Sequence, residues 1–94
     1  MDSRQRGQFI RDKLARGLLP FDPIPRFWGS AGRGEACSGC EEIVTEREPL
    51  VEGLRPGGDG QLVQFHVECF YLWSHARRRW VKNHRGSSEM AIVL

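Results

Sequence analysis

The chain has 94 residues, a net charge of +2, 39% hydrophobic residues, 11 glycines and 5 prolines. A chain of this length forms at most one domain, and so small a core usually needs a further source of stability such as a disulfide or a metal. No segment approaches the roughly 18 consecutive apolar residues that a membrane-spanning helix requires, so we expect no membrane association.

Cysteine usage and the first residues indicate the compartment. The chain has three cysteines, an odd number that does not favour a disulfide framework. Residues 1–10, "MDSRQRGQFI", contain no apolar run that could serve as a secretion signal. We therefore expect a cytoplasmic protein.

The segment 3–17, "SRQRGQFIRDKLARG", is expected to form a helix that Ser3 caps and Gly17 ends. Its apolar residues follow one another at four-residue steps: Ile10, Leu14 and Leu18. A short helix is marginal on its own, so we expect it to dock on the domain through the "FWG" stretch at 27–29, where Phe27 and Trp28 act as packing residues. The alternative is an exposed helix that binds a partner.

Two short motifs, "CSGC" at 37–40 and "FHVEC" at 65–69, place potential metal ligands in two pairs. The four candidate ligands are Cys37, Cys40, His66 and Cys69. Three thiolates and one imidazole suit the tetrahedral preference of Zn(II). Gly39, between the first two cysteines, is expected to take the positive φ of a tight turn. Four protein ligands leave no position for water or substrate, so the sequence predicts one structural Zn(II) per chain.

Two strands and a helix are expected around the second pair of ligands. The runs 46–54, "EREPLVEGL", and 61–66, "QLVQFH", are strand-like, and "RPGGDG" at 55–60 is a strong turn signal between them. Apolar residues recur at three- and four-residue steps in 66–84, "HVECFYLWSHARRRWVKNH", which predicts a helix with the last two ligands on one face of its first turn. We therefore expect a small α+β fold.

Knuckle, hairpin and helix in this order resemble a treble-clef zinc finger and are similar to the first half of a LIM domain. The segments "IRDKLARGLLP" at 10–20, "FWGSAGRGEACSGC" at 27–40 and "FHVECFYLW" at 65–73 resemble a family of small uncharacterised bacterial proteins with a helix, a Trp/Gly-rich linker and this Cys/His set. The resemblance implies the fold and the metal and implies no activity. The order of the predicted elements suggests a division into residues 1–34 (helix and Trp/Gly-rich linker), 35–85 (zinc-binding domain) and 86–94 (flexible tail).

The charges are unevenly distributed along the chain. Residues 35–70 carry eight acidic and two basic side chains, whereas both flanking segments are net basic. The predicted last helix has a basic stripe opposite the ligand face, and its candidate nucleic-acid contacts are Arg78, Arg79, Lys82 and Arg85. A solvated helix face with cations near the helix C-terminus explains the same stripe, and we favour that interpretation.

The sequence contains no glycine-rich phosphate loop, no paired catalytic carboxylates and no Ser/His/Asp arrangement, so we expect no enzyme and no small-molecule substrate. The prediction is a non-enzymatic, zinc-stabilised binding module with a protein partner, because the acidic hairpin would repel a nucleic acid laid across it. Nucleic-acid binding through the basic helix is one alternative. The other is a redox- or metal-sensing switch in which partly exposed thiolates release zinc on oxidation.

Overall fold

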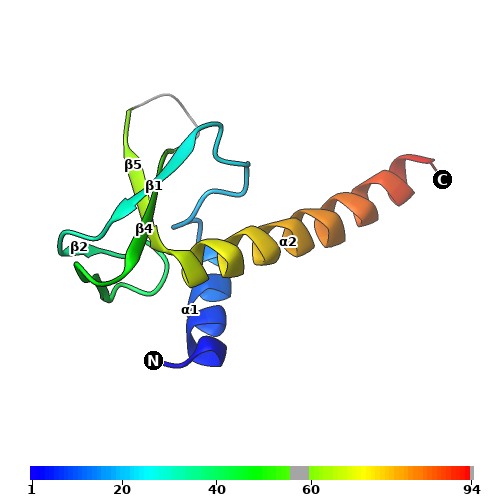
Figure 1. Ribbon diagram of the computed structural model, residues 1–94. Helices are drawn as coiled ribbons and strands as arrows, with labels where there is room; N and C mark the ends of the chain where they lie inside the picture. The colour runs from blue at the N-terminus through cyan, green and yellow to red at the C-terminus, as the bar shows by residue number, and fades with distance from the viewer. Residues whose placement is uncertain (56–59, 94) are drawn as a thin grey trace.

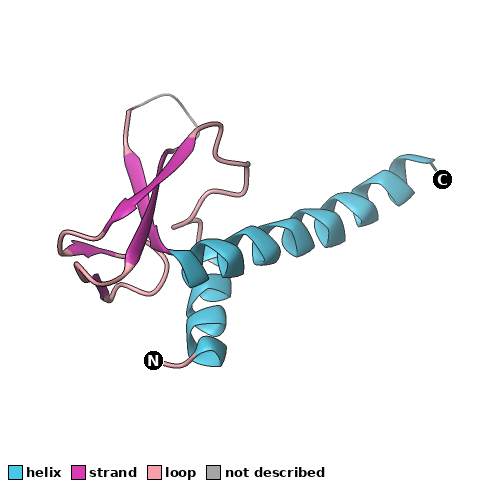
Figure 2. Cartoon of the chain, in the orientation of Figure 1, coloured by secondary structure: helices cyan, strands magenta, loops and turns pink. Residues whose placement is uncertain are grey.

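The computed structural model describes residues 1–55 and 60–93, with side chains as far as Trp80. It is a small α+β structure of two helices and two antiparallel sheets (Figure 2), as the sequence predicts at this level of detail. The elements in chain order are α1 (Ser3–Ala15), β1 (Phe27–Ala31), β2 (Glu35–Ala36), β3 (Ile43–Val44), β4 (Pro49–Leu54), β5 (Leu62–His66) and α2 (Val67–Val93).

The larger sheet contains the predicted hairpin and one strand that the sequence analysis missed. β4 and β5 are antiparallel, with Leu50 opposite His66 and Leu54 opposite Leu62. β1, which we expected to be an extended linker, pairs with the other side of β4 to give the order β1-β4-β5. β1 lacks a period-two apolar pattern, because two adjacent aromatic residues precede a glycine and a serine. Only its pairing with β4 identifies this segment as a strand.

The core lies between this sheet and the first turns of α2. Phe65 of β5 is fully buried and stacks on Trp73 of α2 at 5.5 Å between ring centroids. Phe70 packs edge-on against Phe65 at 6.0 Å between ring centroids, and its ring is tilted against that of Phe27 of β1 at 5.1 Å. Phe27 therefore packs on Phe70, as predicted, although 58% of its surface is exposed, and Trp28 is 43% exposed.

Residues next to α1 in the sequence determine where the helix begins and ends. The N-cap is Asp2, one residue before the predicted Ser3, and its carboxylate accepts a hydrogen bond from the backbone N–H of Gln5 at 2.8 Å. The side chain of Gln5 accepts from the backbone N–H of Asp2, which completes a capping box. At the other end Gly17 has φ +73°, and the N–H of Leu18 reaches the carbonyl of Lys13, so the predicted stop is confirmed.

α1 is docked, but against α2 and the cysteine-containing loop instead of the "FWG" stretch. Figure 1 shows α1 crossing the first turns of α2. Its buried residues are Gly7, Ile10 and Leu14. Leu18, which we predicted to continue the apolar stripe, is 49% exposed because the helix has already ended at Ala15.

α2 is longer than expected and projects beyond the sheet (Figure 1). It begins at Val67 and continues to Val93, so residues 86–93, predicted as a flexible tail, continue its helical backbone. The side chains of 81–93 lie outside the described part of the chain, and the domain division stays a prediction. In the part that the structure describes, neither helix combines the length and the apolar character needed to cross a membrane.

Candidate metal centre

The first two cysteines lie in a tight turn between β2 and β3. The carbonyl of Cys37 accepts from the N–H of Glu41 at 2.9 Å, and the N–H of Cys37 donates to the carbonyl of Glu42 at 2.9 Å. The backbone N–H groups of Gly39 and Cys40 point at the sulfur of Cys37. These N–H groups stabilise negative charge on the sulfur, which is what a metal-binding thiolate requires.

Gly39 is required here for a different reason from the one predicted. The positive φ in the turn belongs to Glu41, at +70°, and Gly39 does not share it. A Cβ atom on Gly39 would lie 3.1 Å from Cδ1 of Ile10 and 3.3 Å from Cβ of Cys69. Glycine is therefore needed because α1 and α2 both press against the turn, which is a tertiary contact that spacing alone does not reveal.

The second pair of ligands lies at the junction between β5 and α2. His66 is the last residue of β5, one position before the helix in which we had placed it, and Cys69 is in the first turn of α2. Nδ1 of His66 lies 3.4 Å from the sulfur of Cys40 and 3.9 Å from the sulfur of Cys69. These values match the edge of about 3.6 Å that Zn–S and Zn–N bonds define in a tetrahedron.

All four predicted ligands come together. The donor atoms of Cys37, Cys40, His66 and Cys69 lie within 4.8 Å of one another, and all four residues are buried. The described part of the chain contains no other cluster of three or more such side chains. These four residues could therefore coordinate one metal ion.

The orientation of His66 supports ligation through Nδ1. Its other ring nitrogen, Nε2, lies 3.2 Å from the carbonyl oxygen of Ile43 and 3.6 Å from Oε1 of Glu48. A carbonyl can only accept, so this hydrogen bond places the proton on Nε2 and leaves Nδ1 as the electron-pair donor. Glu48 is itself fixed by the N–H and the hydroxyl of Thr45, and the backbone hydrogen bond is the main cause of the lowered pKa of Glu48.

The three sulfurs cannot all be anionic without a counter-charge. A hydrogen bond from the thiol of Cys69, assisted by backbone N–H groups, lowers the pKa of Cys37 to about 4. The same hydrogen bond raises the pKa of Cys69, and burial raises the pKa of Cys40. A cation among them reverses this balance, because the thiolate is the form that binds metal.

α1 supplies two cations beside the centre, a contribution that the sequence analysis missed. Arg6 donates to Glu68 at 2.7 Å and lies 3.6 Å from Glu42. Burial opposes the charge of Arg6, but the hydrogen bond to Glu68 and the nearby sulfurs outweigh it and raise the pKa of Arg6. Lys13 donates to the carbonyl of Ser38 in the turn at 2.9 Å. Arg6 and Lys13 are seven residues apart, or two helical turns, and this spacing is the signal that could have identified them.

The candidate nucleic-acid contacts are not part of the cluster. Arg78 and Arg79 are exposed on α2, and Nε of Arg78 donates to the carbonyl of Ser74 at 3.2 Å. The side chains of Lys82 and Arg85 lie outside the described residues.

Comparison with known proteins identifies no relative: no family model, no curated protein and no solved structure matches the chain. The resemblance to treble-clef and LIM-like zinc fingers therefore stays a prediction. The fold and the site define a small α+β protein with a buried Cys3His cluster that could hold one metal ion.

Proposed function

We propose that the cluster holds one structural Zn(II) and that the protein is a non-enzymatic, zinc-stabilised binding module. The observation that carries this proposal is the convergence of four buried donors from three segments: the β2–β3 turn, the end of β5 and the start of α2. A metal bound there would join segments that are far apart in the sequence and otherwise share a small core.

The donor set favours zinc over other metals. Zn(II) accepts mixed sulfur and imidazole ligands in a tetrahedron, whereas Mg(II) and Ca(II) require oxygen ligands. Turn, hairpin and helix occur in the order of a treble clef, in which these ligands close the coordination shell. A closed and buried shell leaves no position for a substrate, so the zinc would stabilise the fold and would not act as a catalyst.

Metal content and two matched histidine variants test this proposal. Elemental mass spectrometry of the purified protein should give about one zinc per chain. His66→Asn should lose most of it, because Nδ1 of His66 faces two of the sulfurs. His75→Asn should keep it, because His75 is exposed on α2 away from the cluster. A folded wild-type protein without metal would contradict the proposal.

A protein is the partner that we propose for the module. The hairpin segment concentrates acidic side chains, and exposed Phe27, Trp28 and Tyr71 are suited to a protein interface. Nucleic-acid binding is the second candidate, supported by exposed Arg78 and Arg79 on α2. Titration with random duplex and single-stranded RNA at increasing salt separates the two, since phosphate binding weakens steeply with salt concentration.

A redox- or metal-sensing switch receives less support. That hypothesis relies on partly exposed thiolates, yet Cys37, Cys40 and Cys69 expose 1%, 2% and 0% of their surfaces. Oxidants react with accessible thiolates, so burial protects these sulfurs. Zinc retained under mild peroxide is the result we expect.

A further inference from the structure

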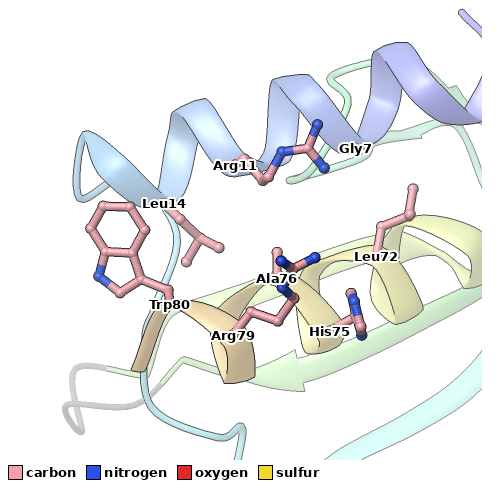
Figure 3. A pocket seen from close by; sticks show the side chains of 8 residues that line it. All are labelled: Gly7, Arg11, Leu14, Leu72, His75, Ala76, Arg79 and Trp80. Carbon is pink, nitrogen blue, oxygen red and sulfur yellow. The ribbon is translucent and has the colours of Figure 1, made fainter. Parts of the chain in front are cut away.

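A groove of about 450 Å³ lies between α1 and α2. Apolar side chains of Leu14, Leu72 and Ala76 form its floor, and Trp80 closes one end. Figure 3 shows the side chain of Arg11 lying along α1 toward Gly7 and that of Arg79 on α2, on the other side of the groove. The volume is within the range of ligand pockets and suits one or two side chains of a partner.

The groove is open because α1 contributes a glycine at this position. A Cβ atom on Gly7 would meet only the flexible end of Arg11 at 3.3 Å and Cδ2 of Leu72 at 3.8 Å. Packing therefore does not require glycine there, although glycine inside a helix costs about 1 kcal/mol relative to alanine. The absence of a side chain leaves space next to the apolar floor.

The polar groups around the groove are basic. Arg11, His75 and Arg79 line it, and no carboxylate does so among the described residues. Arg11 donates to the uncharged Gln8 at 3.1 Å, while the neighbouring Asp12 pairs with Arg16. Arg79 has no ion pair or side-chain hydrogen bond with any residue that the structure describes.

We propose that this groove binds an acidic segment of a partner protein, with one apolar or aromatic side chain on the floor and carboxylates against Arg11 and Arg79. The guanidinium groups come from opposite helices and can each donate two parallel hydrogen bonds to a carboxylate. The proposal names a partner for the binding module and so rests on the proposed function.

The apolar floor distinguishes this ligand from a nucleic acid. A phosphate backbone gains from a line of cations and gains nothing from Leu14, Leu72 and Ala76. An amphipathic acidic peptide uses the floor and the arginines together. Burial of its apolar side chain makes part of the affinity insensitive to salt.

Peptide selection tests the proposal with a library of random eight-residue peptides displayed on phage. Selection on the full chain should enrich sequences in which at least two acidic residues flank an apolar or aromatic one. For an enriched peptide made synthetically, Arg79→Glu and Arg11→Glu should each weaken binding at least tenfold in fluorescence anisotropy. Arg78→Glu is the matched control, because it makes the same charge change one residue away outside the groove, and it should change affinity less than twofold.

Four outcomes would overturn this assignment. These are no enrichment of acidic peptides, equal weakening by Arg78→Glu and Arg79→Glu, RNA binding in place of peptide binding, and self-association that Arg79→Glu abolishes. The last outcome would mean that a second copy of the chain binds in the groove. All variants should retain the zinc content of the wild type. If zinc is bound but no acidic peptide is, only the proposal for the groove is wrong. If the wild type lacks zinc, the proposed function is wrong.

Discussion

The cysteine-containing turn and the groove between the helices use the same kinds of residue in opposite ways. At the turn, Gly39 is pressed between Ile10 and Cys69, and the cations Arg6 and Lys13 have acceptors. In the groove, a Cβ atom on Gly7 would meet only the end of the Arg11 side chain and Cδ2 of Leu72, and Arg79 has no acceptor among the described residues. The cations of the first region form ion pairs and hydrogen bonds within the fold, whereas we propose that the second region binds a partner.

The largest difference between the two regions should appear when a ligand to the metal is removed. Cys69→Ser should abolish zinc binding and unfold the sheet and the turn, because structural zinc contributes roughly 10 to 16 kcal/mol in apparent terms while whole domains are stable by about 5 to 15 kcal/mol. Arg79→Ala in the groove should leave unfolding unchanged within about 0.5 kcal/mol. Circular dichroism with zinc analysis measures both. A Cys69→Ser protein with the wild-type spectrum and melting temperature would remove the basis of the comparison.

The next largest effect concerns the contact of α1 with the turn. Ile10 is fully buried beneath Gly39, so Ile10→Ala should destabilise the zinc-loaded protein by about 2 to 5 kcal/mol. Leu18→Ala, beyond the end of the same helix, should cost less than about 0.5 kcal/mol because Leu18 is exposed. Urea unfolding of both variants measures the difference. Equal losses would mean that α1 is not docked as described.

Replacing glycine by alanine should change the free energy of unfolding in opposite directions in the two regions. Gly39→Ala should destabilise by about 1 to 3 kcal/mol, since its methyl group meets Ile10 and Cys69 at 3.1 to 3.3 Å. Gly7→Ala should stabilise by about 0.5 to 1 kcal/mol, because alanine is the better helix former and only the mobile end of Arg11 must move. Thermal melts of zinc-loaded protein give both signs, and destabilisation by Gly7→Ala would show that the groove is closely packed.

The smallest effect that we expect is a loss of stability at acid pH through protonation of Glu68. Hydrogen bonds from Ser3 and then from Arg6 lower the pKa of Glu68. A lowered pKa means that the stabilisation is present above the ordinary glutamate pKa of about 4.3 and is lost as the pH falls below it. Because Glu68 is partly exposed, we expect only about 0.5 kcal/mol. Comparing unfolding of wild type and Glu68→Gln at pH 7 and pH 4 isolates this contribution, and a difference that grows at pH 4 would contradict it.

The sequence predicts the ligands and the hairpin well because their signals are local. Cys37, Cys40, His66 and Cys69 are identifiable from spacing and donor chemistry, and the β4–β5 pairing follows from two strand-like runs joined by a turn. The class of fold follows from the same elements.

Contacts between distant segments were not predictable in the same way. β1 is a strand because β4 offers it an edge, and Gly39 is glycine because two helices meet at it. The role of Gly7 likewise depends on where α2 crosses α1. In each case the cause is a contact with a residue that is remote in sequence. Composition and periodicity do not predict such a contact.

X-ray absorption spectroscopy at the zinc edge of the purified protein would identify the atoms that surround the metal. We predict a first coordination shell of three sulfur atoms at about 2.3 Å and one imidazole nitrogen at about 2.0 Å, with no further oxygen. A shell with an added oxygen or with fewer sulfurs would contradict a closed structural site formed by Cys37, Cys40, His66 and Cys69.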